Sequence, residues 1–521
     1  MEWEDFLHLK ASVAGIKLNT GFKNALDLME NSKKNVFITG RAGTGKSTLL
    51  QFFMSITKKS VAVLAPTGVA ALNVKGQTIH SFFKFRPDVT VDSIGRVSKN
   101  RAEQYKNIDM IIVDEVSMVR ADLFDCIDRF MRLNGKKRNF PFGGVQMIFI
   151  GDLYQLPPVV SRTEIRMFRD YYKSEYFFDA KAFKNFKAEF IELEENYRQE
   201  DAGFIKILNS IRNNTVSESQ LEILNNRVKT NFSPEGGVIL VPTNALAEEI
   251  NNSNLKELYG MEHSYNAVLE GDFKKFELPS KEKLVLKRGA QVMLLNNEEG
   301  KRWVNGSVGI VTSISAYKTA IGVKLTDGSE VEVEPHTWKL FKFSYDSKSK
   351  KLVSEVAGRF TQYPLALAWA LTIHKSQGKT FDRIVLDVGS GMFANGQLYV
   401  ALSRCRTING IVLIKKLEKK HVFSDWRVVK FLTEYQYSKS NEKMSVEEKT
   451  NMISKAIKDK KKIDIVYLKS NDEKSRRVIT PSSVGMFNYL GKSYLGVKGF
   501  DSMQGDYRNF RVDKMLEIKI V

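Results

Sequence analysis

The sequence predicts an α/β protein with several domains, and three observations lead to this prediction. Residues 40–47 match the phosphate-binding pattern G-x-x-x-x-G-K-[ST] at every fixed position. The apolar run 35–39 before this loop is typical of a buried strand, and the run 48–54 after it is compatible with a helix. The chain has 521 residues, which is too long for one hydrophobic core and favours about three or four domains.

The phosphate loop predicts a site for a nucleoside triphosphate. Its glycines let backbone N–H groups surround a polyphosphate, and the helix N-terminus adds roughly half a positive charge. We expect Lys46 to neutralise the β- and γ-phosphates and Ser47 to ligate Mg²⁺. The alternative is a glycine-rich turn before an ordinary helix, which the matching flanks disfavour. The expected nucleotide contacts are Gly40, Ala42, Gly43, Thr44, Gly45, Lys46, Ser47 and Thr48.

A second apolar strand, residues 108–113, is followed directly by Asp114 and Glu115. Two carboxylates at the carboxyl end of a strand are what a triphosphate site needs beside its phosphate loop. We expect Asp114 to hold Mg²⁺ and Glu115 to orient and deprotonate the attacking water. The alternative is a surface strand that ends in acidic residues. A third strand, 145–150, leads to Gln155, which is placed to sense a γ-phosphate.

Composition excludes several classes of protein. Hydrophobic residues make up 43% of the chain, and no apolar run approaches the roughly 20 residues that span a bilayer. The N-terminus is acidic and lacks a secretory apolar segment, so we expect a cytoplasmic protein without a membrane partner. Cys126 and Cys405 lack metal-ligand spacing and are expected to be ordinary buried residues in a reducing compartment.

The chain carries a formal net charge of +20, from 80 Lys and Arg against 60 Asp and Glu. Such a charge attracts polyanions, and it favours nucleic acid through counterion release. Excess lysine can equally serve solubility. Charge alone therefore suggests a nucleic-acid partner without establishing one.

Further segments resemble the motifs of superfamily 1 helicases, specifically the Pif family and its RecD-like relatives of the 5′-to-3′ branch. The resemblance covers about residues 18–430 and includes the family's own signature region, at 121–125 and 141–146. The other matching segments of the first half are 65–71, 78–82, 114–118 and 151–158. Those of the second half are 193–199, 241–244, 287–293, 304–306, 368–378 and 396–404.

This resemblance implies two RecA-like P-loop motor domains with small insertions, with ATP and Mg²⁺ as cofactors and single-stranded DNA and DNA junctions as partners. It also implies that Arg198 and Arg404 reach the γ-phosphate from the second motor domain and make hydrolysis depend on closure of the cleft. Gly378 is implied as a further nucleotide contact. Without the flanking motifs, either arginine would equally be a surface ion pair.

The same resemblance implies a track for single-stranded DNA. Hydroxyl, imidazole and ammonium groups suit phosphate oxygens and carry little base information. Phe82 is a candidate for stacking on bases, although an aromatic residue after a turn is more often part of a core. The implied DNA contacts are Thr67, His80, Ser81, Phe82, His374 and Lys375.

One departure from the family concerns the base of the nucleotide. Relatives often carry a glutamine before the phosphate loop that reads the adenine edge, in a Leu-x-x-x-Gln setting. The corresponding run here is 18–22, which contains no glutamine. The residue that selects adenine therefore stays open.

After about residue 430 the helicase resemblance ends and a small β-rich unit follows. Its strand-like runs and Tyr494-Leu495 resemble the WYL domain, although the Trp of that name is missing. The family's basic groove implies a nucleic-acid or small-ligand site at Arg477, Arg508 and Arg511. The alternative is a solvated basic face.

These resemblances predict the domain organisation and the function. We expect an ATP-driven 5′-to-3′ DNA helicase that translocates on single-stranded DNA, with G-quadruplexes and R-loops as further candidate substrates. The alternatives are a DNA-stimulated nucleoprotein remodeller and a motor regulated by a ligand-sensing C-terminal module. The expected parts are motor domain 1A at 1–200 with an insertion at about 84–104, motor domain 2A at 201–306 and 361–434, an SH3-like barrel at 307–360, a linker at 435–448 and a WYL-like domain at 449–521.

Overall fold

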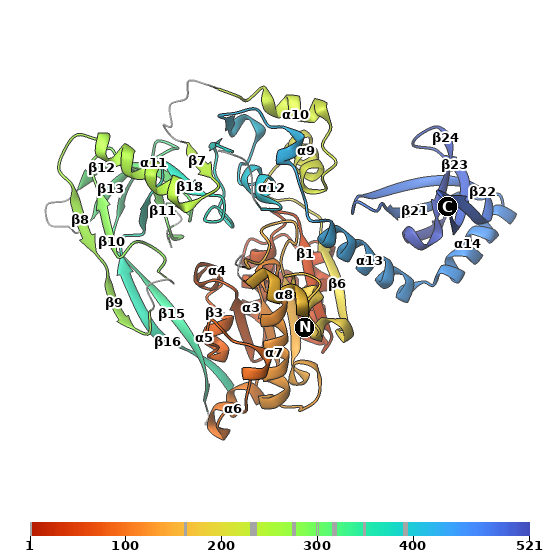
Figure 1. Ribbon diagram of the computed structural model, residues 1–521, viewed down its shortest axis with the longest axis horizontal. Coiled ribbons are helices and arrows are strands. Elements are labelled where there is room, and N and C mark those ends of the chain that lie inside the picture. The colour runs from red at the N-terminus through yellow and green to blue at the C-terminus, as the bar shows by residue number, and fades with distance from the viewer. Residues whose placement is uncertain are drawn as a thin grey trace. The chain divides into compact units, whose positions relative to one another are not determined.

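The computed structural model describes residues 3–160, 164–229, 237–273, 278–298, 300, 302–314, 320–346, 351–388 and 394–521. The chain forms two compact units (Figure 1). Unit 1 comprises Met1–Ile211 and Val216–Phe423, and unit 2 comprises Arg212–Thr215 and Ser424–Val521. None of the helices in these described parts is long and apolar enough to cross a membrane.

The first lobe of unit 1 is built on a six-stranded parallel sheet with the order β3-β2-β4-β5-β1-β6. Its central strands are buried along their whole length, as expected for a parallel sheet that helices cover on both faces. The strands are β1 (Asn35–Gly40), β2 (Val61–Ala65), β3 (Gln77–Thr78), β4 (Met110–Val113), β5 (Gln146–Ile150) and β6 (Ala188–Leu193). The helices are α1 (Trp3–Val13), α2 (Thr20–Asn31), α3 (Lys46–Ile56), α4 (Gly68–Asn73), α5 (Ile79–Phe83), α6 (Lys99–Lys106), α7 (Ala121–Asn134) and α8 (Glu164–Tyr171).

The second lobe of unit 1 has a smaller parallel sheet with the order β18-β7-β19-β20. Two parallel sheets in one unit confirm the predicted α/β class with two lobes. The strands are β7 (Val238–Val241), β18 (Ala370–Thr372), β19 (Ile384–Leu386) and β20 (Ile411–Leu413). The helices are α9 (Ala202–Arg212), α10 (Glu218–Asn225), α11 (Asn244–Glu257) and α12 (Gln397–Leu402).

A β-rich insertion interrupts the second lobe, and it is larger than the predicted range 307–360. Its five-stranded antiparallel sheet has the order β14-β13-β12-β11-β17, so it includes strands on both sides of that range. These strands are β11 (Gln291–Leu294), β12 (Val308–Ile314), β13 (Ile321–Leu325), β14 (Glu330–Val333) and β17 (Leu365–Leu367). The remaining strands of the insertion are β8 (His263–Asn266), β9 (Val268–Gly271), β10 (Lys283–Leu286), β15 (His336–Asp346) and β16 (Lys351–Gln362).

The long strands β15 and β16 extend from this insertion toward the first lobe (Figure 1). Phe343 on β15 packs its ring 6.0 Å from that of Phe82 on α5. The Phe343 backbone N–H also donates to Gln77 Oε1 at 3.3 Å. The insertion therefore contacts the segment of the first lobe that the sequence assigns to the DNA track.

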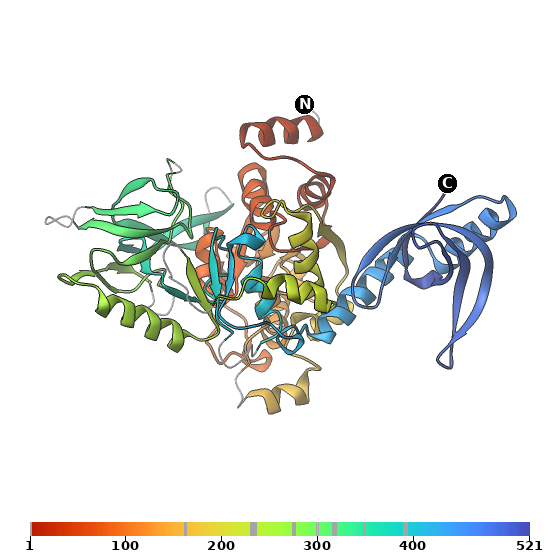
Figure 2. The ribbon, with the colours of Figure 1, turned by 90° about the horizontal axis from the view of Figure 1, so that it is seen from above.

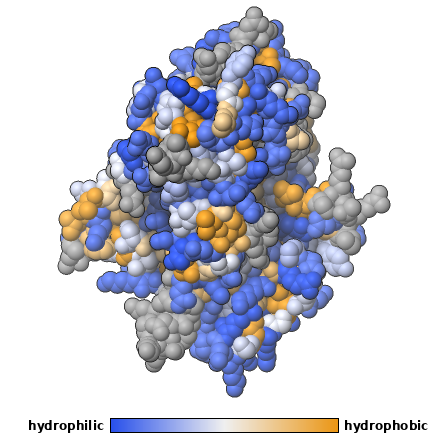
Figure 3. Space-filling view, turned by 90° about the vertical axis from the view of Figure 1, so that its left-hand side faces the viewer, coloured by the Kyte–Doolittle hydropathy of each residue, from blue (hydrophilic) through white to orange (hydrophobic). Residues whose placement is uncertain are grey.

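The face of the molecule on this side is mostly hydrophilic, with hydrophobic residues in small separate groups (Figure 3).

Unit 2 contains a five-stranded antiparallel sheet with the order β24-β23-β22-β21-β25 and strongly curved strands (Figure 2). Ile453 of α14 belongs to the same hydrophobic core as Val497 and Phe510 of the sheet. The strands are β21 (Ile463–Leu468), β22 (Lys474–Tyr489), β23 (Lys492–Asp501), β24 (Asp506–Arg511) and β25 (Met515–Ile520), and the helices are α13 (Trp426–Lys443) and α14 (Val446–Lys458).

The predicted linker at 435–448 is wrong, because most of it is helical. The polar run near its centre forms the last turns of α13, where Ser440 is buried and donates to the Leu516 carbonyl at 2.7 Å. Lys449 of α14 is also buried and donates to Ser440 Oγ at 2.8 Å. Polar residues that are buried and hydrogen-bonded at the edge of a core have the same composition as an exposed linker. Composition alone therefore gave the wrong prediction for this segment.

Candidate functional site

The phosphate loop connects β1 to α3, as the sequence predicts. Thr44 is buried within it, while Ser47 and Thr48 lie on the exposed first turn of α3. Lys46 Nζ donates to the carbonyls of Gly40 at 2.7 Å and Arg41 at 3.0 Å. The Lys46 ammonium group is therefore held over the loop, where a bound polyphosphate would sit.

Gly43 shows why this loop requires glycine. Its φ of +87° lies in the left-handed region, and an added Cβ would lie 2.7 Å from Arg198 Cβ and 2.9 Å from Asn196 Oδ1. The segment that follows β6 thus packs directly on the phosphate loop. The Tyr197 backbone N–H also donates to the Gly43 carbonyl at 2.9 Å.

The two predicted carboxylates lie at the carboxyl end of β4, beside Lys46. Burial and the neighbouring Glu115 raise the pKa of Asp114 to about 7. Burial also raises the pKa of Glu115, while the positive charges of Lys46 and Arg404 oppose that rise. Glu115 has φ 49°, a left-handed conformation that is uncommon for a residue with a side chain and is a feature of functional sites.

The oxygen atoms of this region suit a hard divalent cation. Burial is the main cause of the raised pKa values of the Asp114 and Glu115 carboxylates, and the Ser47 hydroxyl adds a further oxygen on α3. Among the residues that the structure describes, no group of three or more His, Cys, Asp or Glu side chains could hold a metal alone. Mg²⁺ typically takes one or two carboxylates together with waters and substrate phosphates, so Asp114 and Ser47 fit this ion.

The two predicted arginines both lie at this site. Arg198 lies in the segment that follows β6 and packs on the phosphate loop, so it belongs to the first lobe, which corrects the prediction that it comes from the second. Its Nη1 donates to the Ser403 carbonyl at 3.1 Å, and its charge adds to burial, which is the main cause of the lowered pKa of Lys46. Arg404 follows α12 of the second lobe, is 1% exposed, and has its pKa lowered to about 9, chiefly by burial. The site thus combines cationic groups from both lobes.

Sequence reasoning missed two contacts that join the lobes. Gln377 Nε2 donates to Glu115 Oε2 at 3.1 Å and to Gln155 Oε1 at 3.2 Å. The Tyr399 hydroxyl accepts from the Ala42 backbone N–H at 2.9 Å and lies 3.2 Å from Asp152 Oδ2. Gln377 and Tyr399 lie inside recognised motifs, but a glutamine or tyrosine there gives no sequence signal of its partner.

The run that lacks the expected glutamine has other roles. Asn19 caps α2 by accepting from the Phe22 N–H at 2.8 Å, and its Nδ2 donates to the Tyr197 hydroxyl at 2.9 Å. Phe22 is 2% exposed and lies against Gly45 of the phosphate loop. The Tyr197 ring is 47% exposed and lies beside Gly45 of the loop, so it offers an aromatic surface for a base.

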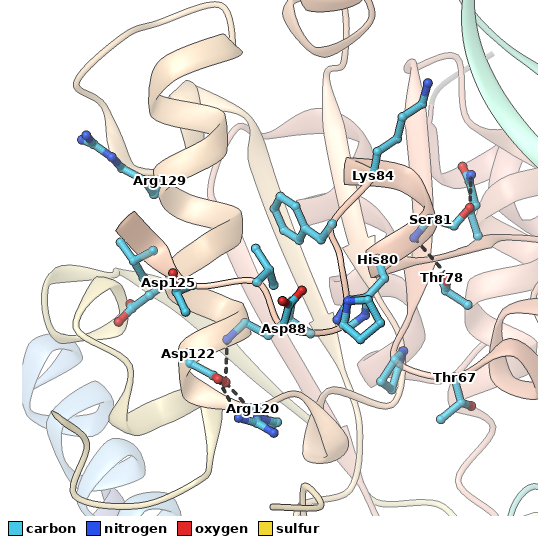
Figure 4. A pocket seen from close by; sticks show the side chains of 18 of the residues that line it. Thr67, Thr78, His80, Ser81, Lys84, Asp88, Arg120, Asp122, Asp125 and Arg129 are labelled. Atoms are coloured by element: carbon cyan, nitrogen blue, oxygen red, sulfur yellow. Dashed lines mark hydrogen bonds and ion pairs between the residues drawn. The ribbon is translucent and has the colours of Figure 1, made fainter. Parts of the chain in front are cut away.

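A cavity of about 1840 Å³ in unit 1 contains three of the predicted DNA contacts, Thr67, His80 and Ser81 (Figure 4). Burial lowers the pKa of His80, which favours its neutral form. Acidic groups also line this cavity, but several are already paired. Arg120, for example, donates to Asp122 Oδ2 at 2.8 Å and to Glu164 Oε1 at 3.0 Å.

Three other predicted DNA contacts do not line this cavity. His374 and Lys375 lie on the second lobe directly after β18, and Lys375 is exposed. Phe82 is 2% exposed and packs among Phe83, Tyr105 and Phe343. The ring of Phe82 therefore belongs to an aromatic core and offers no face to a base. The structure supports the core alternative for Phe82 and not the candidate stacking role.

In unit 2 the three predicted basic residues differ in their surroundings. Arg477 is partly buried and pairs with the fully buried carboxylate of Asp501. Arg511 donates to Asp513 through Nε at 3.0 Å and Nη2 at 2.6 Å. Arg508 is exposed and lies 3.4 Å from Gln504 Oε1. Two of the three positive charges are therefore balanced inside the domain.

Two parallel sheets that bring a phosphate loop, paired carboxylates and arginines into one cleft define a P-loop motor ATPase with two RecA-like lobes. The model of the PIF1-like helicase family matches residues 18–222, and the WYL domain model matches residues 448–520. The ATP-dependent DNA helicase Pif1 of Bdellovibrio bacteriovorus is 33% identical over 81% of this chain and 93% of its own length. The human ATP-dependent DNA helicase PIF1 is 32% identical over 76% of this chain and 61% of its own.

Solved structures agree with these relatives. Unliganded Pif1 from Bacteroides sp. has 36% identity and a TM-score of 0.74 over 81% of this chain and 97% of its own. The Bacteroides sp. Pif1 complex with ADP-AlF4 has 35% identity and a TM-score of 0.75 over 81% of this chain and 98% of its own. The chain belongs to the family of PIF1-like helicases, and it carries a WYL domain at its C-terminal end.

Proposed function

We propose that this helicase hydrolyses ATP to translocate 5′-to-3′ along single-stranded DNA and to separate duplex DNA ahead of it. The observation that carries this proposal is the meeting of Glu115 from the first lobe with Gln377 and Arg404 from the second. A site completed by both lobes hydrolyses ATP only when they close, and closure on each cycle supplies a step along a strand. The related Bacteroides Pif1 has been solved bound to single-stranded DNA.

In this proposal the residues of the cleft divide the chemistry between them. Lys46 and the loop N–H groups hold the β- and γ-phosphates, and Gly378 adds a contact from the second lobe. Ser47 and Asp114 hold Mg²⁺, which neutralises charge on the phosphate oxygens. Glu115 takes the proton of the attacking water, while Gln155 senses the γ-phosphate. Arg198 and Arg404 stabilise the negative charge on the transferring group, a role worth about 10³–10⁵ in rate elsewhere.

The single-stranded DNA track in this proposal runs over both lobes. Thr67, His80 and Ser81 contact phosphates on the first lobe, and His374 and Lys375 do so on the second. All are small polar or cationic groups, which suit binding without base specificity. The net charge of +20 favours a polyanionic partner such as DNA. We propose the nucleoid of a bacterial cytoplasm as the location of the protein and DNA junctions among its substrates.

For the WYL domain we propose a weaker polyanion site centred on the exposed Arg508, with a nucleic acid or a small anionic ligand as its occupant. The pairing of Arg477 and Arg511 with carboxylates limits this site. An Arg508→Ala variant should bind single-stranded DNA less tightly at low salt, whereas unchanged binding would remove this proposal.

Unwinding of 5′-tailed and 3′-tailed duplexes tests the main proposal. We expect ATP-dependent strand separation on the 5′-tailed substrate only. A protein that displaces a bound protein from DNA but unwinds neither duplex would instead be a nucleoprotein remodeller. Unwinding from the 3′ tail would contradict the proposed polarity.

A further inference from the structure

Gln377 lies in a tight turn that directly follows β18 of the second lobe. The Lys375 N–H donates to Thr372 Oγ1 at 3.2 Å, and Ser376 Oγ donates to the Ile373 carbonyl at 2.7 Å. The Gln377 N–H itself donates to the His374 carbonyl at 3.1 Å. Ser376 is fully buried within this turn. These bonds hold residues 372–377 together as a short element, so a displacement at one of its residues is transmitted to the others.

The Gln377 side chain crosses from this turn to the first lobe. Its Nε2 donates to Glu115 Oε2 at 3.1 Å and to Gln155 Oε1 at 3.2 Å, which uses both protons of the amide. An amide oxygen in that position would face two other oxygens. The amide nitrogen must therefore point at Glu115.

The orientation of Gln155 is fixed in the same way. Its Nε2 donates to Asp152 Oδ2 at 3.3 Å, so its oxygen faces Gln377. The Tyr399 hydroxyl reaches the same Asp152 oxygen at 3.2 Å and accepts from the Ala42 N–H of the phosphate loop. A chain of hydrogen bonds thus runs from the phosphate loop to Glu115 and passes through both lobes.

We propose that Gln377 is a positioning residue that couples occupancy of the DNA track to the placement of the Glu115 carboxylate. This inference rests on the proposed function, because it takes Glu115 as the base and His374 and Lys375 as DNA contacts. Those two residues immediately precede Gln377 and its neighbour Ser376 in the same turn. A DNA phosphate that engages Lys375 moves the turn, and the turn moves the amide that holds Glu115.

The distances support a contact that tightens during turnover. Hydrogen bonds from N–H donors to oxygen atoms are most often about 2.9–3.0 Å long, and catalytic hydrogen bonds often shorten only in the reacting complex. The bond to Glu115, at 3.1 Å, is longer than that. A small displacement of the turn toward the first lobe would shorten it and aim the carboxylate at the attacking water.

Substitution of Gln377 separates positioning from binding. Gln377→Met keeps the length of the side chain but removes both donors, and Gln377→Glu replaces them with a charge that repels Glu115. Gln51→Met is the matched control, because Gln51 is exposed on α3. For each variant we would measure kcat and KM for ATP with and without saturating oligo-dT, together with the Kd values for oligo-dT and for a fluorescent non-hydrolysable ATP analogue.

We expect Gln377→Met to lower the DNA-stimulated kcat by about 10- to 100-fold, since a small misplacement of a catalytic group costs that much. KM, both Kd values and the thermal stability should match those of Gln51→Met, and Gln377→Glu should lose at least as much stimulation. The DNA-free rate should fall less, so that the stimulation ratio collapses. Full stimulation in Gln377→Met would overturn the inference, and so would a loss that appears in KM or in either Kd instead of kcat.

A parallel Glu115→Gln variant shows which idea has failed. If Glu115→Gln is inactive while Gln377→Met is fully stimulated, only the positioning role of Gln377 is lost. If Glu115→Gln itself turns over normally, the proposed role of Glu115 is wrong and the inference falls with it.

Discussion

Substitution of Glu115 by glutamine isolates the chemistry of the nucleotide site. Glutamine has nearly the same shape and keeps an oxygen that can accept from Gln377, so the contact at 3.1 Å can persist. It cannot take a proton from water. Because general-base catalysis contributes about 10²–10⁴ in rate, we expect kcat at saturating single-stranded DNA to fall by about that factor.

The same substitution should not weaken nucleotide binding. Burial lowers the pKa of Lys46, and the negative charge of Glu115 opposes that change and offsets the charges of Lys46 and Arg404. A neutral residue leaves the site more positive, which favours a polyphosphate. The Kd of a fluorescent ATP analogue should therefore stay equal or decrease. Normal ATP turnover by Glu115→Gln, measured as phosphate release, would refute the reasoning.

Two further predictions concern stability. Asp472 and Arg212 form a buried pair in unit 2 with an N···O distance of 3.7 Å. Asp472→Ala leaves the arginine without this partner, so it should lower the unfolding free energy of that unit by about 3–5 kcal/mol, measured by urea denaturation. An unchanged denaturation midpoint would contradict this. Burial lowers the pKa of Lys379 to about 8 from 10.5. Between pH 8 and pH 10.5 the unfolded chain therefore binds more protons at this group than the folded chain does. The contribution of Lys379 to stability thus rises with pH in this range. Lys379→Met should flatten the pH dependence of the unfolding free energy in that range. An unaltered slope would mean that other groups cause the pH dependence.

Much of the nucleotide site follows from local sequence. The phosphate loop and the two carboxylates after β4 each occupy a few consecutive residues, and the parallel sheet brings the carboxyl ends of their strands together. Neighbours in sequence therefore determine this half of the site. The second lobe is different, because its contacts through Gln377 and Arg404 depend on residues more than two hundred positions away.

The predictions that failed depended on non-local contacts. Phe82 is buried because Tyr105 and Phe343 pack against it, and neither is its neighbour in sequence. Arg477 is paired because β22 and β23 bring Asp501 beside it. The last turns of α13 fall in the predicted linker because their polar residues face a partner surface that the sequence does not reveal. In each case the chemical character of the side chain is evident from the sequence, but the residue that it contacts is not.

The central claim is that the second lobe completes the ATP site. The most direct test is ATP hydrolysis by Arg404→Lys at saturating single-stranded DNA, since lysine keeps a positive charge but loses the planar fork that stabilises the transferring phosphoryl group. We expect nucleotide binding to persist and kcat to fall by about 10³-fold or more. Hydrolysis at the unmodified rate would contradict the claim, because the first lobe would then suffice for catalysis.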